Sequence, residues 1–213
     1  FIARMDADDI SNSDRFASQI ELMQKEQLDF CGSDILVVSE TGTLLEAIVM
    51  PATPELIAIT MACTVPFAHG SVMMRSAFIK THQLLYAQGS SAEDYDLWCR
   101  AFRLGARFGN VSQFLFSYRH LSSSLSKVHA KVVHQNTKAL RRQFVAQNIN
   151  ALEPAINVLS KSKVQLSTRD ATFLLLAAYL VSLQTKSALV IRVAKMSSMK
   201  TRFLAIAKIL TGF

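Results

Sequence analysis

The sequence predicts an α/β fold followed by a region made only of helices, and three observations carry this prediction. Up to about residue 120, apolar runs rich in β-branched residues alternate with stretches whose apolar residues recur at helical spacing. From residue 126 onward the helical spacing continues alone. Half of the 213 residues are hydrophobic, and only 7 are glycine and 4 are proline, so the chain can bury a sizeable core.

Local patterns place the first elements. Apolar residues at near-helical spacing from Phe16 to Met23 predict a helix of about three turns. Two β-rich runs, 30–38 and 44–50, flank a Glu-Thr-Gly turn and predict paired strands. Pro54 predicts the start of a helix, because proline is favoured at the first helical position. A further helix is predicted over 93–102, since its acidic start and basic end suit the helix dipole.

Later segments complete the sheet and the helical region. The run from His69 to Arg75 predicts a short strand between loops, and 107–108 with 112–118 predict closing strands. Beyond residue 126, breaks between helices are expected around Pro154 and over 160–167.

Cysteine usage and hydropathy indicate a cytoplasmic protein. Cys31, Cys63 and Cys99 are odd in number, far apart and surrounded by apolar residues, which predicts reduced core thiols. The longest strongly apolar stretch, 173–183, is too short to cross a bilayer as a helix. The first residues do not have the pattern of a signal peptide.

The net charge of +7 is unevenly spread, with an acidic start and a basic end. The basic side chains of residues 160–213 favour attachment to an anionic membrane face, which would place the protein at the inner face of the plasma membrane. They equally fit a helical subdomain with a solvated basic surface, because they do not form one stripe. No motif that reads nucleic acid accompanies the charge, so we expect no nucleic-acid partner.

Three carboxylates occupy four positions near the start of the chain: Asp6, Asp8 and Asp9. Like charges at this spacing raise one another's pKa unless a cation or hydrogen-bond donors neutralise them. Oxygen ligands of this kind suit Mg²⁺ or Mn²⁺, particularly when the metal also carries substrate phosphates. The alternative interpretation is that Asp8 or Asp9 caps the helix that follows, because aspartate is favoured at helix starts.

A second acidic pair, Glu93 and Asp94, begins a helix that follows a loop, where open α/β sheets place ligands. A diphosphate held by metal near the first motif would be a leaving group. A carboxylate of the second motif could then take a proton from an attacking hydroxyl. The alternative is favourable charge at a helix N-terminus and nothing more.

Four segments together resemble the family 2 glycosyltransferases and cover about residues 1–126. Their Asp-x-Asp segment is resembled by Arg4 to Ser11 with Asp14-Arg15-Phe16 and Gln19, and the segment between their metal and base motifs by His69 to Arg75. Their Glu-Asp motif is resembled by Ala92 to Trp98. The Tyr-Arg-x-His type of segment that closes the domain is resembled by Tyr118-Arg119-His120.

The resemblance implies an inverting sugar transferase with a GT-A fold, a mixed sheet that binds a nucleoside-diphosphate sugar. On this template Asp6, Asp8 and Asp9 would bind Mn²⁺ or Mg²⁺ and the sugar nucleotide. Asp94 would be the general base, with Glu93 beside it. The acceptor would be a hydroxyl of a growing surface glycan or a lipid-linked glycan.

The remaining candidates are less specific. Arg119 would contact the donor diphosphate, since arginine suits phosphate geometry. His120 would complete the metal shell or contact the diphosphate, as a late histidine often does in the family that the chain resembles. His69 would lie near the acceptor, or would be a structural histidine. Trp98 is expected in the core rather than as a platform for a sugar.

Two departures from the family pattern are present. Ser13 stands where the family usually has proline, which should only loosen a turn. The family's first strands precede the Asp-x-Asp segment, and nothing here corresponds to them, so we expect an N-terminally truncated catalytic domain over 1–126 and a helical basic region over 127–213. The rival hypothesis is a truncated, non-catalytic module that binds a membrane surface or a partner. A metal-dependent phosphatase is a weaker rival, because the chain lacks an identifiable nucleophile motif.

Overall fold

The structure, a computed structural model, describes four stretches of the chain: residues 1–88, 92–121, 130–162 and 165–211. Contacts between residues divide the chain into two compact units. The first unit comprises Phe1–Thr53 and Pro66–Thr137, and the second comprises Pro54–Val65 and Lys138–Phe213.

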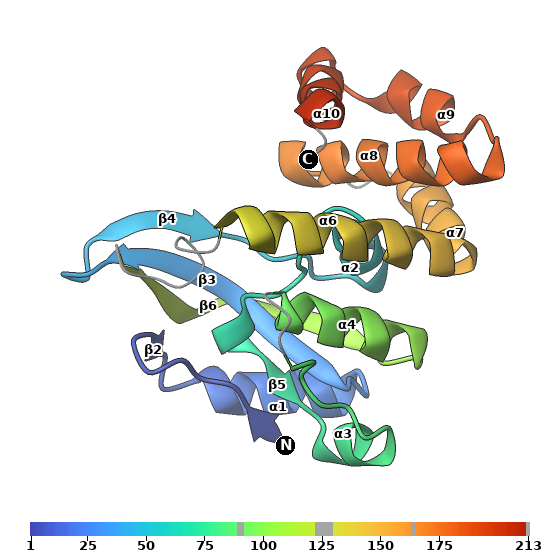
Figure 1. Cartoon of the computed structure of the whole chain (residues 1–213). Helices are drawn as coiled ribbons and strands as arrows, with labels where there is room; N and C mark the ends of the chain where they lie inside the picture. Colours follow the sequence, from blue (N-terminus) through green and yellow to red (C-terminus); the bar gives the residue numbers. More distant parts are fainter. Residues whose placement is uncertain (89–91, 122–129, 163–164, 212–213) are drawn as a thin grey trace. The chain divides into compact units, whose positions relative to one another are not determined.

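The first unit is built on a mixed six-stranded sheet (Figure 1). Five of its strands follow the order β1-β5-β3-β6-β2, and the sixth, β4, pairs with β3 outside this order. Among the described strands β3 and β6 run parallel, and every other pairing is antiparallel. The strands are β1 (Ile2–Ala3), β2 (Ile10–Ser11), β3 (Phe30–Ser39), β4 (Leu44–Ile48), β5 (Met73–Met74) and β6 (Phe108–His120).

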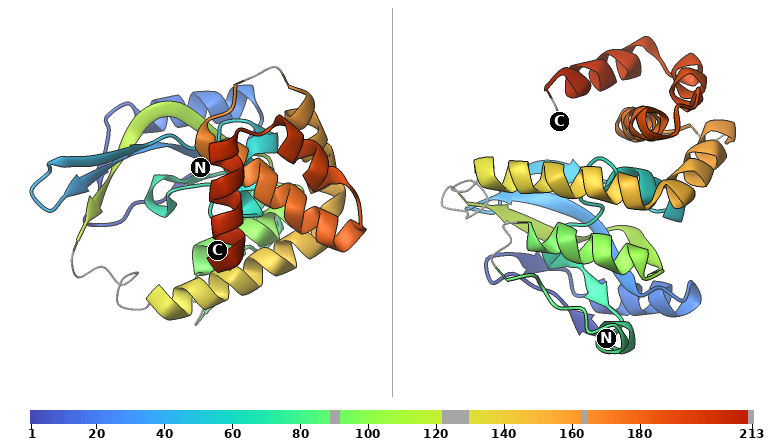
Figure 2. Two further views of the ribbon diagram at one scale, coloured as in Figure 1. Left: turned by 90° about the horizontal axis from the view of Figure 1, so that it is seen from above. Right: turned by 45° about the vertical axis from the view of Figure 1, so that its right-hand side comes forward.

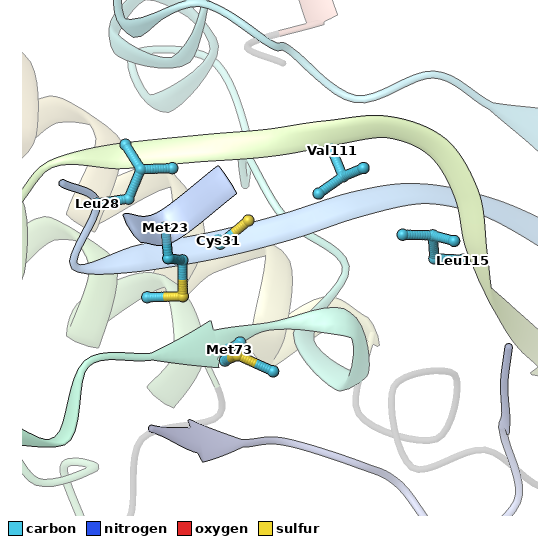
Figure 3. Close-up of a cluster of buried hydrophobic side chains, with 6 residues drawn as sticks. All are labelled: Met23, Leu28, Cys31, Met73, Val111 and Leu115. Atoms are coloured by element: carbon cyan, nitrogen blue, oxygen red, sulfur yellow. The ribbon is translucent and has the colours of Figure 1, made fainter. Parts of the chain in front are cut away.

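One face of this sheet is covered by α1 (Arg15–Lys25), which packs against β3 and β6. The buried side chains between them form a cluster that Figure 3 shows at close range. The helix is amphipathic, and Met23 contributes to this cluster from its last turn. The cluster consists of Met23, Leu28, Cys31, Met73, Val111 and Leu115.

The opposite face carries an aromatic core beneath α4 (Glu93–Arg103). Phe30 precedes Cys31 in β3 and therefore points to the other side of the sheet. Its ring centroid lies 5.4 Å from that of Trp98 and 5.1 Å from that of Phe108. Phe67 contacts Trp98 as well, at 5.5 Å between centroids. Trp98 is completely buried, so its predicted place in the core is confirmed.

Two short helical pieces complete the first unit. A single 3₁₀ turn, η1 (His69–Ser71), precedes β5, and α3 (Ser76–Thr81) follows it. The predicted strand over 69–75 is therefore shorter than expected, because its first half forms this turn.

The second unit is helical in its described residues. α2 packs on α7 and α8, while α9 and α10 both pack on α8 (Figure 2). No described helix is sufficiently long and apolar to traverse a membrane. The helices are α2 (Pro54–Met61), α6 (Ala130–Gln147, which begins within the first unit), α7 (Ile149–Lys161), α8 (Thr168–Thr185), α9 (Leu189–Met196) and α10 (Met199–Thr211).

Most predicted elements are confirmed, and two further predictions are corrected. The closing strands expected at 107–108 and 112–118 form the single strand β6. Its pairing with β3 shifts where Val111 is followed by Phe114, so the exposed pair 112–113 bulges without ending the strand.

Pro154 does not break a helix, because it lies inside α7. Its neighbours Leu152 and Ile156 are completely buried, and this packing outweighs the one backbone hydrogen bond that proline removes. The break falls at Asn148, between α6 and α7.

The predicted fold class is confirmed as a mixed α/β sheet with a helical C-terminal region. The finer assignment to GT-A stays a prediction. The predicted domain boundary after residue 126 lies outside the described residues and also stays a prediction. Contacts between residues group α2 with the later helices.

Replacing Phe67 by alanine should lower the free energy of unfolding by about 3–5 kcal/mol, because it leaves a cavity beneath α4. Phe67 is 1% exposed, whereas Phe114 is 42% exposed. The control Phe114→Ala should cost less than about 1 kcal/mol. Urea unfolding followed by circular dichroism measures both, and equal losses would contradict this description of the core.

Candidate active site

The carboxylate motif forms a loop between β1 and β2. The loop turns sharply, because the Asp9 amide donates to the Asp6 carbonyl at 3.3 Å. Both side chains reach Gly70 in η1: a Cβ added there would lie 3.0 Å from Asp9 Oδ2 and 3.2 Å from Asp6 Oδ2. Asp8 is exposed. Glycine at position 70 thus allows two carboxylates of the motif to converge on one place.

Asp9 is held by the last strand of the sheet. Its Oδ1 accepts a hydrogen bond of 2.8 Å from the Arg119 amide of β6. Burial raises the pKa of Asp9, and the charges of Asp8 and Asp6 add to this, while the Arg119 amide opposes it. Asp9 thus links the first acidic motif to β6, which contains the closing segment Tyr118-Arg119-His120.

The interpretation of Asp8 or Asp9 as a helix cap is wrong. The helix begins at Arg15, with Asp14 at its N-cap position and without a side-chain capping bond. The Asp9 carboxylate is engaged by the Arg119 amide instead.

Arg4 links the carboxylate motif to η1. Its Nη2 lies 2.6 Å from Asp6 Oδ1, and its Nε donates to His69 Nε2 at 3.3 Å. The Tyr86 hydroxyl is 3.0 Å from the same Nε2. Because an arginine Nε only donates, His69 Nε2 is the acceptor and its ring carries the proton on Nδ1; the Tyr86 hydroxyl therefore donates as well.

The second acidic motif lies on the helix that this histidine contacts: the centroid of the His69 ring is 6.3 Å from that of Trp98, one turn after Asp94 in α4. Asp94 opens α4, and its Oδ1 accepts a hydrogen bond of 2.7 Å from the Tyr95 amide. Burial raises the pKa of Asp94, the Tyr95 amide opposes the rise, and the neighbouring Glu93 adds to it. A partly buried carboxylate with a raised pKa beside a histidine is suited to take up a proton.

Behind the carboxylate loop, α1 supplies a buried polar support that sequence reasoning did not assign to the site. Arg15 is completely buried, donates from Nη2 to the Arg4 carbonyl at 2.8 Å, and donates from Nε to Gln19 Oε1 at 3.1 Å. Gln19 donates in turn to the carbonyls of Cys31 and Ser71, both at 2.8 Å. The signal was visible: two polar residues four apart on the buried face of an amphipathic helix.

The carboxylate loop could supply one or two ligands to a metal, but not a complete metal cage. In the part of the chain that the structure describes, no three His, Cys, Asp or Glu side chains form a metal cage. Mg²⁺ commonly uses one or two carboxylates together with substrate phosphates and water. Asp6 and Asp9 converge beside Gly70 and Asp8 is exposed, which leaves carboxylate oxygens for this mode of binding.

The other predicted donor-binding residues, Arg119 and His120, lie at the end of β6. Arg119 is tied to Asp9 through its amide, and His120 is exposed at the end of β6. Nucleophilic catalysis by cysteine is disfavoured, because burial raises the pKa of all three thiols to about 12. These thiols are free and buried, as predicted.

The chain is similar over part of its length to bacterial glycosyltransferases. It is 32% identical over 130 residues to "Putative glycosyltransferase EpsE" of Bacillus subtilis (strain 168), which covers 60% of this chain and 46% of that protein. It is also 32% identical over 128 residues to "O-antigen biosynthesis glycosyltransferase WbnJ" of Escherichia coli, covering 59% and 50%. The chain thus spans about half the length of these curated relatives. No family model matches it.

Arg15→Lys should lower the free energy of unfolding by about 1–3 kcal/mol, because a lysine ammonium cannot replace a guanidinium that donates to both the Arg4 carbonyl and Gln19. The exposed Arg142→Lys is the control and should change it by less than about 0.5 kcal/mol. Chemical denaturation measures both variants. If Arg15→Lys proved as stable as the control, the two hydrogen bonds of the buried Arg15 guanidinium would have no structural role.

Proposed function

We propose that this chain carries part of the active site of an inverting glycosyltransferase. The reaction would move a sugar from a nucleoside diphosphate to a hydroxyl of a surface-glycan acceptor, such as a lipopolysaccharide or capsule precursor. One observation carries the proposal: contacts run from Asp6 through Arg4 to His69, and the centroid of the His69 ring lies 6.3 Å from that of Trp98 in α4, the helix that begins with Glu93-Asp94. The partial likeness to two glycosyltransferases favours sugar transfer over phosphate hydrolysis.

The donor would lie at the carboxylate loop. Asp6, Asp8 and Asp9 would hold Mn²⁺ or Mg²⁺ together with the diphosphate, and the metal, when bound, neutralises charge on the departing group. Arg119 and His120 follow in β6 and would contact the phosphates from that side.

Asp94 would act as the general base. Its carboxylate takes the proton of the acceptor hydroxyl while the hydroxyl oxygen forms a bond to the anomeric carbon. The bond between that carbon and the diphosphate oxygen breaks on the opposite face, so the configuration inverts. Burial, which raises the pKa of Asp94, makes it a stronger proton acceptor than an ordinary carboxylate.

An alternative function is supported by the second unit, and it needs no catalysis. Leu183, Ile191 and Ile206 are 62%, 58% and 55% exposed, and they occur among basic residues. Apolar and basic side chains together suit an anionic membrane surface, at the cytoplasmic face of the plasma membrane. In this alternative the chain would be a membrane-surface or partner-binding module.

Asp94→Asn should lower the rate of sugar transfer at least about a hundredfold, because the amide cannot accept the acceptor's proton. Donor binding should be nearly unchanged, since the substitution leaves the carboxylate loop intact. Transfer to methyl glycosides is measured with a panel of uridine, guanosine and thymidine diphosphate hexoses plus Mn²⁺, and donor binding by calorimetry.

Asp14→Asn is the matched control, an exposed aspartate at the start of another helix, and it should transfer at the wild-type rate. Transfer by Asp94→Asn at that same rate would remove Asp94 as the base. If the unaltered chain neither binds a donor nor transfers sugar but sediments with anionic vesicles, the non-catalytic alternative replaces the proposal.

A further inference from the structure

Tyr86 occupies a place between the two acidic motifs, although it belongs to neither. It lies in the loop between α3 and α4. Its hydroxyl donates to His69 Nε2 at 3.0 Å, and its ring meets the His69 ring edge to face, with centroids 5.5 Å apart. Even so, 37% of the residue is exposed. One end of Tyr86 is thus anchored while part of its surface stays open to a ligand.

The loop that carries Tyr86 is fixed to the helix of the second motif. Arg100 of α4 donates from Nη2 to the Leu85 carbonyl at 2.7 Å. The same guanidinium is held by Asp96, one turn earlier in α4, at 2.7 Å. Tyr86 is therefore held from both sides, by His69 through its hydroxyl and by α4 through its preceding residue.

The charges around Tyr86 come from both motifs. Burial raises the pKa of its phenol, the carboxylates of Asp94, Glu93 and Asp6 raise it further, and Arg4 opposes them. His69, which the Tyr86 hydroxyl contacts, also bonds Arg4 of the donor loop, and its ring centroid lies 6.3 Å from that of Trp98 in α4, so Tyr86 lies between the two motifs. A sugar hydroxyl that gives its proton to Asp94 must lie within this same space.

We propose that the Tyr86 ring is the surface on which the acceptor sugar rests while one of its hydroxyls faces Asp94. A pyranose presents C–H groups on its faces and hydroxyls at its rim. An anchored tyrosine matches this, since it offers a rigid apolar ring with a polar end. The inference rests on the proposed function and adds to it the contact that positions the acceptor.

Two substitutions separate the ring from its hydroxyl. Tyr86→Ala removes the platform and should raise the acceptor KM about tenfold or more, which corresponds to about 1.4 kcal/mol of binding. Tyr86→Phe keeps the ring and should leave this KM within about threefold. The donor KM should stay within about twofold in both variants, because the donor loop does not include Tyr86.

The experiment uses the purified chain with Mn²⁺, the diphosphate hexose panel, and methyl β-D-glucopyranoside and β-D-galactopyranoside as acceptor probes. Saturation-transfer NMR of the same glycosides measures acceptor binding without requiring transfer. Leu85→Ala is the control, because Leu85 is 74% exposed and adjacent in the loop. It should leave both KM values and glycoside binding unchanged.

If the unaltered chain transfers sugar, an unchanged acceptor KM and unchanged glycoside binding in Tyr86→Ala would overturn the inference. Equal losses in Tyr86→Phe and Tyr86→Ala would also overturn it, since the hydroxyl rather than the ring would then matter. Failure of the unaltered chain to bind any donor or glycoside would instead contradict the proposed function itself.

Discussion

A buried guanidinium that is satisfied mainly by backbone and amide acceptors organises this molecule. Arg15 is completely buried and, among the described residues, forms no ion pair with a carboxylate; burial lowers its pKa to about 10. A buried charge is costly unless hydrogen bonds compensate it, so the Arg4 carbonyl and Gln19 must stay where they are. Gln19 extends the constraint to the Ser71 carbonyl of η1. The carboxylate loop and the turn that carries His69 and Gly70 are therefore set against the same helix.

This support explains how two motifs far apart in the sequence come to share one place. The loop after β1 presents Asp6 and Asp9 to Gly70, and the same turn presents His69 to Arg4 and toward α4. A diphosphate at the first motif and a nucleophilic hydroxyl at the second would then lie on opposite sides of one reacting carbon. The proposed inversion requires that arrangement of leaving group and nucleophile.

Sequence patterns predicted what depends on local signals. Pro54 begins α2, the acidic residues of 93–96 begin α4, and the order of the motifs identified Asp6 and Asp94 as candidates. Contacts between distant residues were beyond such patterns. Asp9 bonds an amide 110 residues away, the bulge in β6 depends on its pairing with β3, and the position of Tyr86 depends on its bond to His69. Asp9, Arg119 and His69 belong to recognised motifs, but no pattern in the chain indicates that they pair as they do, whereas the spacing of Arg15 and Gln19 did indicate their shared buried face.

Paramagnetic broadening by Mn²⁺ tests directly whether both acidic motifs belong to a single site. Mn²⁺ with a nucleoside diphosphate is added to the isotopically labelled chain, and the amide signals are followed by NMR. We predict strong broadening at residues 6–9 and 70 together with 86 and 93–95, and weaker broadening at the Gly105 turn, between the end of α4 and the start of β6. Broadening confined to residues 6–9, with sharp signals for Glu93 and Asp94, would contradict it.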